Sequence, residues 1–227
     1  KDISFVCEPV SNLIHIDRLK DKGASFTASR ILDHKEFLAS TDSWFRPVNL
    51  YTGPDGALYV VDYYREIIEH PEWMSEAAAK SDKLYNGHDL GRIYRITTTQ
   101  AQPASWTTHL NMNKSSDEEL VEKLADPNVW WRLNAQRLLI DRKHMQDVPA
   151  LTQMIHRSKS PLGRLHALWT LEGMHQLTPA LIEEALHDSS AGVRENAVKL
   201  AELHLSQDTN LVPALLALKE DDNPKVR

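Results

Sequence analysis

Residues 46–64 read RPVNLYTGPDGALYVVDYY, two apolar runs joined by a Gly-Pro-Asp-Gly turn. Pro54 fixes φ at about −65° and Gly56 tolerates a positive φ, so this segment reverses the chain. The Val, Leu and Tyr residues on both sides suit a pleated, half-buried surface. The sequence therefore predicts antiparallel strands at 48–52 and 57–62, with a third strand of the same character at 92–97.

The same pattern occurs near the N-terminus. Residues 3–9, ISFVCEP, align with residues 57–63, ALYVVDY, and in both an apolar run ends on an acid, Glu8 or Asp62. A further strand is expected at 24–31. Repeated small sheets are typical of β-propellers, in which each blade covers its neighbour's faces. Because about two blades cannot close a ring, residues 1–100 are expected to be the C-terminal part of a larger antiparallel β-propeller.

The second half of the chain has a longer period. Arg132, Arg164, Arg194 and Arg227 lie 32, 30 and 33 residues apart, and the first three each stand three places before an Ala. Capping residues precede Pro127, Pro161, Pro179 and Pro224, and Ser116 opens a capping box. Helices are expected at 117–125, 128–141, 147–157, 161–173, 179–187, 192–205 and 211–220. Such helices pair into hairpins that stack as an α-solenoid.

A six-residue spacing between Asp and Arg accompanies this period. It joins Asp126 to Arg132, Asp188 to Arg194 and Asp221 to Arg227. The pattern resembles HEAT repeats, which use an Asp and an Arg at these places as a ladder between repeats. Ser158 stands where the repeat of Arg164 is expected to carry its Asp. We therefore expect the contact of the middle repeat, that of Arg164, to be weaker or to use another partner.

These patterns divide the chain into three parts and indicate a multidomain β + α protein. Residues 1–100 are expected to be the propeller part, 101–114 a linker, and 115–227 a HEAT-like α-solenoid. The chain begins at Lys1 without a Met and stops at Arg227, where a second helix is expected to begin. We therefore expect it to be a fragment, cut at both ends.

Composition limits the function classes. The chain has 41% hydrophobic and 26% charged residues, which is ordinary for a globular protein. Its net charge of −6 gives no basic footprint, so no nucleic-acid partner is expected. Cys7 is its single cysteine, which excludes an internal disulfide, a Cys-rich metal cluster and a Cys-x-x-Cys-His haem site within these residues. No apolar run approaches the eighteen or so residues of a transmembrane segment.

Five segments together carry a family resemblance: residues 8–15 (EPVSNLIH), 37–47 (FLASTDSWFRP), 55–65 (DGALYVVDYYR), 68–73 (IEHPEW) and 91–96 (GRIYRI). They resemble the last blades of bacterial membrane-bound dehydrogenase-like propellers. That group is related to the glucose/sorbosone dehydrogenase superfamily, and its members often continue into HEAT repeats and a c-type cytochrome domain.

The resemblance implies that the complete protein is a periplasmic or secreted bacterial oxidoreductase acting on a sugar or polyol. Its candidate cofactors are pyrroloquinoline quinone (PQQ), which does the hydride chemistry, an accompanying Ca²⁺ and a c-type haem that takes the electrons. The catalytic base and most quinone contacts of the superfamily lie on earlier blades. This fragment alone is therefore expected to hold no cofactor and to be inactive.

A different class of function competes with the enzyme. A propeller coupled to a HEAT stack is also typical of non-catalytic scaffolds, because concave solenoid faces bind protein partners readily. A scaffold would carry an exposed apolar or charged stripe along its second helices and would have no pocket in its propeller.

Four residues are candidates for the cleft of a propeller. Glu8 and Asp62 end equivalent strands, where a carboxylate binds a cation or a polyol hydroxyl, or else caps loop amides. Arg46 and Arg65 offer bidentate forks that suit an anionic quinone or a substrate carboxylate. A structural salt bridge from these arginines to Asp62 or Glu69 is the alternative.

The segment Glu69-His70-Pro71-Glu72-Trp73 lies in a long insertion between strands, where functional loops concentrate. His70 is the candidate for chemistry, because imidazole is the common acid–base group of proteins, while Trp73 offers a stacking face. Tyr63 and Tyr64 can donate hydrogen bonds to a sugar, although one of them is expected to be core. The alternative role of the segment is simply to pack over the end of the blade.

The helical half contains several histidines and tryptophans. The histidines lack the i,i+4 spacing around a carboxylate that a zinc-protease helix requires, so they are expected to be solvated and no metal site is predicted. The tryptophans fall at helix positions that are expected to pack between repeats. The residues concerned are His156, His166, His175, His187 and His204, with Trp130, Trp131 and Trp169.

Overall fold

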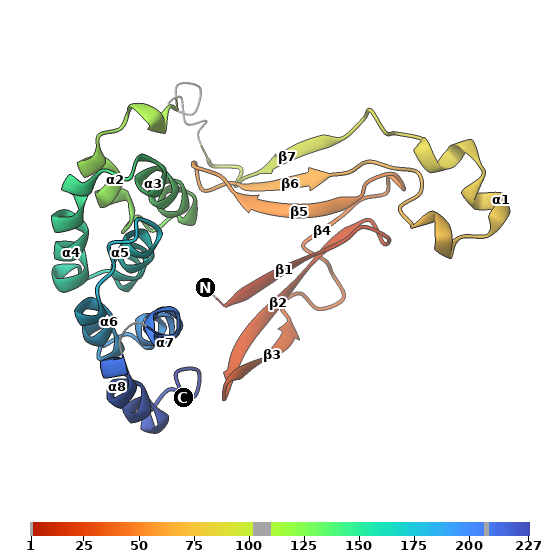
Figure 1. The fold of residues 1–227 in the computed structure, drawn as a ribbon. Helices are drawn as coiled ribbons and strands as arrows, with labels where there is room; N and C mark the ends of the chain where they lie inside the picture. Colours follow the sequence, from red (N-terminus) through yellow and green to blue (C-terminus); the bar gives the residue numbers. More distant parts are fainter. Residues whose placement is uncertain (1, 102–109, 207–208) are drawn as a thin grey trace. The chain divides into compact units, whose positions relative to one another are not determined.

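A computed structural model describes residues 2–101, 110–206 and 209–227 (Figure 1). The chain contains two antiparallel sheets followed by a series of helices, so the predicted combination of an antiparallel β part and an α part is confirmed. Residues 1–104 and 105–227 form two compact units. Of the expected linker, residues 102–109 lie outside the described part of the chain.

The first sheet contains β1 (Ile3–Glu8), β2 (Leu13–Lys22), β3 (Ser25–Arg30) and β4 (Leu38–Ala39). β2 pairs antiparallel with β1 on one side and with β3 and β4 on the other. The strands expected at 3–9 and 24–31 are therefore present. The two-residue strand β4 has no alternation of its own to reveal it and was not predicted.

The second sheet has the order β5 (Pro47–Thr52), β6 (Leu58–Asp62) and β7 (Arg92–Ile96), and all three predicted strands are confirmed. The turn between β5 and β6 has the expected chemistry. Gly56 has a φ of 76°, and Gly53 N–H donates to Ala57 O at 2.9 Å. The Asp55 carboxylate accepts from Ala57 N–H at 3.1 Å and from Arg95 Nε at 2.6 Å, which ties the turn to β7.

The β unit has a small core. Ile14, Phe45 and Val60 are buried, and Phe37, Leu38, Leu50 and Ile96 pack against them. Other apolar side chains of the strands are exposed, among them Ile3, Val6 and Ile93. Much of the apolar surface of these sheets is therefore open to a further partner.

The α unit contains the seven predicted helices. They are α2 (Asp117–Lys123), α3 (Val129–Arg142), α4 (Val148–Arg157), α5 (Pro161–Gly173), α6 (Pro179–Leu186), α7 (Ala191–His204) and α8 (Val212–Ala217). A short helix in the β unit, α1 (Glu76–Ala79), was not predicted. Ser116 and Glu119 form the expected capping box, and Ser160 and Thr178 cap helices that begin with Pro.

One predicted cap is wrong. Asp126 does not place Pro127 in the first turn of α3, because the N-cap of this helix is Asn128. Asp126 instead accepts a hydrogen bond from Asn128 N–H at 2.9 Å, and the Asn128 side chain accepts from Trp130 N–H. The acid therefore orders the turn before the helix.

The helices pack in consecutive pairs, α2 with α3, α4 with α5 and α6 with α7. Within one layer α3 contacts α5 and α5 contacts α7, while α2, α4, α6 and α8 follow one another in the other layer. Each pair thus buries its apolar face against the next.

The arginine side chains join successive helix pairs. Arg164 makes a bidentate pair with Asp188 at 2.6 and 2.7 Å, and Arg194 does the same with Asp221 at 2.6 and 2.8 Å. Each arginine also donates to a backbone carbonyl six residues earlier, Arg164 to Ser158 O and Arg194 to Asp188 O. One side chain therefore fixes its own turn and the next pair together.

Arg132 has a different partner. Arg132 donates to Asp126 O at 2.6 Å. Because Ser158 supplies no carboxylate, the Nε of Arg132 donates instead to Nε2 of His166 at 3.2 Å. The expectation that His166 is solvated is wrong, because this side chain is only 7% exposed and completes the arginine contact.

The three tryptophans are half-buried rather than core residues. Trp169 packs against the apolar cluster and donates from Nε1 to Asn196 Oδ1 at 3.0 Å. The rings of Trp130 and Trp131 meet edge to face at 5.0 Å. A large ring with one N–H group commonly keeps an edge near polar atoms in this way.

Candidate functional site

The insertion between β6 and β7 borders an open pocket of about 560 Å³, which we call the insertion pocket. Its lining includes Tyr63, Arg65, Glu69 and His70, four of the candidates from the sequence. The remaining lining residues are Ile67, Ile68, Pro71, Leu84, Tyr85 and His88. The structure thus brings together candidates from the end of β6 and from the loop that follows.

Arg65 holds the two ends of the insertion together. Its guanidinium donates to Tyr63 O at 2.9 Å, Tyr64 O at 3.0 Å and His88 O at 3.1 Å, and also to Gly87 O. It lies 4.1 Å from the centre of the Tyr63 ring. These carbonyls take the place of the salt bridge expected from the sequence, and they occupy the fork that a ligand carboxylate would need.

Arg46 lies outside the pocket and is buried, with 9% of its surface exposed. Its Nε donates to Arg65 O at 3.0 Å and Nη2 donates to Glu66 O at 2.7 Å. Nη1 donates to Pro9 O at 2.8 Å and Val10 O at 3.2 Å. Arg46 therefore joins the loop after β1 to the start of the insertion, and it pairs with backbone carbonyls where a carboxylate was expected.

The acids that end β1 and β6 hold loop amides. Asp62 is 1% exposed, and its Oδ1 accepts from Arg46 N–H at 2.8 Å and Tyr64 N–H at 2.9 Å. Glu8 accepts from Val10 N–H at 3.1 Å. Neither acid lines the insertion pocket, and both contacts are the amide caps considered as the alternative to a ligand site.

The loop residues differ in how they face the pocket. Glu69 accepts a hydrogen bond from His70 N–H at 2.8 Å, and His70 Nδ1 lies 3.9 Å from Glu72 Oε2. The His70 side chain is 65% exposed and is thus accessible to a ligand. Trp73 is 82% exposed but does not line the pocket, so the structure does not place its ring with the other candidates.

Tyr85 and His88 line the pocket from the end of the insertion and were not predicted from the sequence. Gly87 between them has a φ of 85°, and a Cβ there would lie 2.5 Å from Tyr64 O. The Asn86-Gly87 pair, a common turn signal, was the available indication that the chain turns back here.

The lining determines what the insertion pocket can bind. Two tyrosines and two histidines can donate or accept hydrogen bonds, Glu69 can accept them, and Ile and Pro side chains supply an apolar wall. Aromatic faces beside a few polar groups suit a small ligand with both hydroxyl groups and C–H surface.

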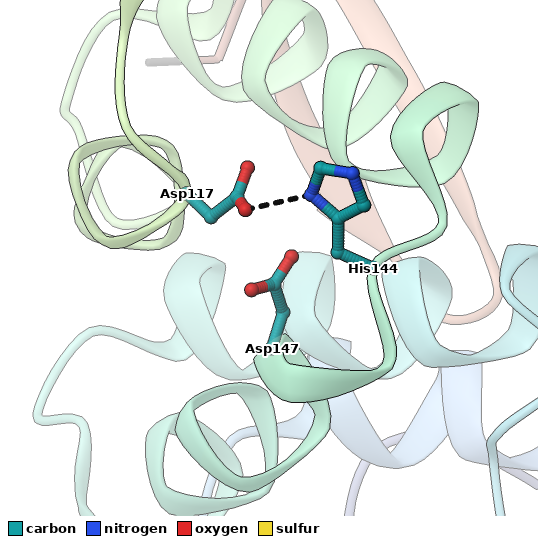
Figure 2. Close-up of side chains that lie close together, drawn as sticks. All are labelled: Asp117, His144 and Asp147. Atoms are coloured by element: carbon teal, nitrogen blue, oxygen red, sulfur yellow. Dashed lines mark hydrogen bonds and ion pairs between the residues drawn. The ribbon is translucent and has the colours of Figure 1, made fainter.

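A second group of polar side chains lies in the α unit (Figure 2), and we call it the carboxylate–histidine cluster. It consists of Asp117 in the first turn of α2, His144 after α3, and Asp147 at the N-cap of α4. Each contributes one nitrogen or oxygen atom, and these three atoms lie within 4.8 Å of one another. They are ligand types that suit a metal ion.

Local structure positions these three residues. Asp117 is the first residue of α2, directly after the N-cap Ser116, and Lys143, with a φ of 53°, ends α3 and turns the chain toward α4. Asp117 Oδ2 lies 2.8 Å from His144 Nδ1, and Asp117 Oδ1 lies 2.7 Å from Arg142 Nη1. The cluster thus combines two acids, a histidine and a neighbouring arginine.

The two acids differ in environment. The hydrogen bond with His144, with Arg142 beside it, lowers the pKa of Asp117. Burial, and next the charge of Asp117, raises the pKa of Asp147. No metal site was predicted from the sequence, because the histidines do not recur at i,i+4 spacing around a carboxylate along one helix. His144 and Asp147 are three residues apart in the turn before α4, and Asp117 reaches them only through helix packing.

Comparison with known proteins gives a match for one part of the chain. Residues 1–100 match the family model of a domain of unknown function, DUF7133. No curated protein and no solved structure matches the chain significantly. Among the described helices, none is both long enough and apolar enough to cross a membrane.

Proposed function

We propose that residues 1–100 are the C-terminal blades of a β-propeller and that residues 115–227 are a HEAT-type α-solenoid. In this proposal both belong to a periplasmic or secreted oxidoreductase that acts on a sugar or polyol. The observation that carries the substrate class is the insertion pocket, whose lining combines aromatic, polar and apolar side chains.

The arrangement of the strands supports the propeller part of the proposal. Two small antiparallel sheets follow one another along the chain, with β1 and β6 each ending on an acid that caps the following loop. Apolar residues such as Ile3 and Ile93 remain exposed on the strands. Neighbouring blades would cover such faces.

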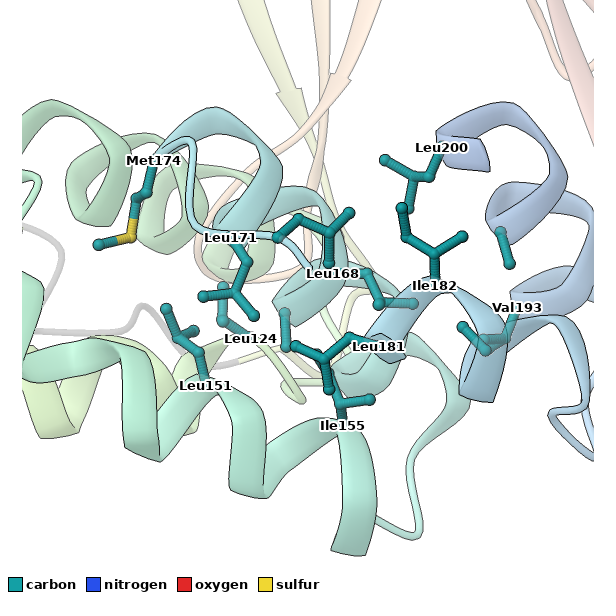
Figure 3. Packing of buried hydrophobic residues seen from close by; sticks show 14 of the residues in the cluster. Leu124, Leu151, Ile155, Leu168, Leu171, Met174, Leu181, Ile182, Val193 and Leu200 are labelled. Atoms are coloured by element: carbon teal, nitrogen blue, oxygen red, sulfur yellow. The ribbon is translucent and has the colours of Figure 1, made fainter. Parts of the chain in front are cut away.

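The helix contacts support the solenoid part. The helix pairs share one continuous apolar cluster that runs from α2 through α7 (Figure 3). Arg164 and Arg194 each bind an Asp of the following pair. A stack in which every pair contacts mainly its neighbours is the arrangement expected of a HEAT-type solenoid.

The residues described here do not fit a bound quinone. PQQ carries several carboxylates, yet Arg46 and Arg65 already donate to backbone carbonyls. The quinone, its Ca²⁺ and the haem therefore belong, in this proposal, to other parts of the complete protein. The contribution of this chain is to bind substrate hydroxyls, with His70 as the candidate base and Glu69 beside it.

Ligand titration of residues 1–227 tests the proposal, with glucose and sorbitol followed by chemical-shift changes. Binding is expected to weaken at least tenfold in His70→Ala and Tyr85→Phe. Trp73→Ala is the matched control, because Trp73 belongs to the same loop but lies off the pocket, and it should bind normally. Absence of binding, or an equal loss in all three variants, would contradict the substrate proposal.

A non-catalytic propeller–HEAT scaffold that binds a protein partner is the second candidate. The observation in its favour is that Arg46, Asp62 and Arg65 are used for internal hydrogen bonds. The protein that contains this chain, supplied with PQQ, Ca²⁺ and an artificial electron acceptor, should oxidise polyols if the enzyme proposal is right. A closed propeller without turnover and without haem absorbance would favour the scaffold.

A further inference from the structure

We propose that Asp117, His144 and Asp147 form a binding site for a divalent transition-metal ion of the Zn²⁺ type. The site lies between the N-termini of α2 and α4 and is independent of the insertion pocket. It does not depend on the oxidoreductase proposal.

An unpartnered atom points to a ligand. Asp147 is 5% exposed, and its Oδ2 is buried without a hydrogen-bond partner in the part of the chain that the structure describes. Figure 2 shows this carboxylate directed toward Asp117 and His144. A buried polar atom without a partner destabilises the folded state, and more so if it is charged. A cation between the three side chains would supply the missing partner.

The donor set favours one class of ion. One imidazole nitrogen and two carboxylate oxygens are ligands of Zn²⁺ and related ions, whereas Mg²⁺ and Ca²⁺ prefer oxygen alone. Metal–ligand distances of about 2.0–2.2 Å place tetrahedral ligands about 3.3–3.6 Å apart. The three atoms lie within 4.8 Å of one another. The ion would replace the hydrogen bond between Asp117 Oδ2 and His144 Nδ1, so these two atoms would move apart from their present 2.8 Å. The partly exposed His144 leaves room for water as a fourth ligand.

The surroundings both support and oppose a cation. Arg142 holds Oδ1 of Asp117 and leaves Oδ2 turned toward the site, as groups that orient metal ligands commonly do. Glu118 adds a further negative charge near Asp147. The positive charge of Arg142 and the N-termini of α2 and α4 oppose a cation. The balance of two or three acids against one arginine favours binding of moderate strength.

The test uses untagged residues 1–227, stripped of metal with EDTA. Calorimetric titration with ZnSO₄ should give one equivalent bound, and CoCl₂ should give the visible absorption bands of coordinated Co²⁺. MgCl₂ should not compete. Asp147→Asn and His144→Gln preserve side-chain size and are expected to weaken Zn²⁺ binding at least tenfold. Zn²⁺ should also raise the Tm of the unsubstituted chain but not of these variants.

The matched control is His156→Gln. His156 Nδ1 lies 2.8 Å from Glu184 Oε1, the same kind of contact as His144 with Asp117 but outside the cluster. This variant should bind Zn²⁺ normally. No binding to the unsubstituted chain would overturn the proposal. Equal losses of Zn²⁺ affinity in His156→Gln and His144→Gln would also overturn it. The same holds if Asp147→Asn is more stable than the unsubstituted chain and binds Zn²⁺ with unchanged affinity.

Discussion

The Nε of Arg132 donates a hydrogen bond to Nε2 of His166 at 3.2 Å, and the Nδ1 of His166 lies 2.6 Å from Gln136 Oε1. Nε2 must therefore be unprotonated, which fixes the neutral Nδ1–H tautomer. Burial, and next the charge of Arg132, lowers the pKa of His166 to about 4. Where Arg164 and Arg194 have a carboxylate, Arg132 has a neutral imidazole.

This contact predicts acid sensitivity of the α unit. The unfolded chain binds a proton at His166 near pH 6.5, whereas the folded chain does so only near pH 4. The stability that neutral, buried His166 contributes is therefore fully present above the pKa of the unfolded chain and is lost as the pH falls from about 6.5 to about 4. Urea unfolding at pH 7 and pH 5 should show a loss of roughly 2 kcal/mol from this residue.

The control for this effect is His166→Gln, which keeps a hydrogen-bonding side chain but cannot titrate. This variant should be less stable at pH 7 and should lose less stability than the unsubstituted chain between pH 7 and pH 5. An identical pH dependence in the two proteins would show that His166 does not titrate as described.

Breaking the ion pair between Arg164 and Asp188, which joins two helix pairs, should reduce the free energy of unfolding much more than breaking a surface ion pair. The side chains of Arg164 and Asp188 are each 11% exposed, so Asp188→Ala leaves a nearly buried arginine without its partner. It also removes the acceptor for Ser190 N–H. We expect a loss of about 3–5 kcal/mol in chemical denaturation.

Glu195→Gln provides the comparison, because Glu195 makes an exposed i,i+4 pair with Lys199 in the same unit. This change should cost less than about 0.5 kcal/mol. Asp188→Ser, which copies the residue found at 158, should fall between the two. Similar losses of unfolding free energy in Asp188→Ala and Glu195→Gln would mean that the Arg164–Asp188 ion pair adds little to stability.

The regular elements were predictable because their signals are local. The Pro54–Gly56 turn, the alternating strands around it and the helix caps all act within a few residues. The partners of Arg46 and Arg65 were not predictable, since they are backbone carbonyls, which every residue carries. Burial of His166 follows from Ser158 at a position where the neighbouring repeats have Asp. The carboxylate–histidine cluster likewise depends on helix packing, which no spacing reveals.

The turn by which the insertion leads back to β7 should depend on Gly87. Its φ of 85° is strained for other residues, and an added Cβ would lie 2.5 Å from Tyr64 O. Gly56 has a similar φ of 76° but has open space around it. Gly87→Ala should therefore lower the Tm further than Gly56→Ala, and it should also weaken ligand binding at the insertion pocket. Equal effects on Tm would indicate that backbone conformation alone matters.

The two units should differ in how well they fold alone. Among the described residues, the cluster of the β unit contains three buried side chains, Ile14, Phe45 and Val60, whereas the α unit has a continuous cluster from Leu120 to Leu211. Burial of each large apolar side chain stabilises a fold by about 1.5–3 kcal/mol, so the α unit has far more to offset its loss of chain entropy. Limited proteolysis of residues 1–227 should leave a resistant fragment that begins near residue 110 and is helical by circular dichroism. A resistant β fragment with a degraded helical half would contradict this expectation and would mean that the exposed faces of the sheets find a partner in solution.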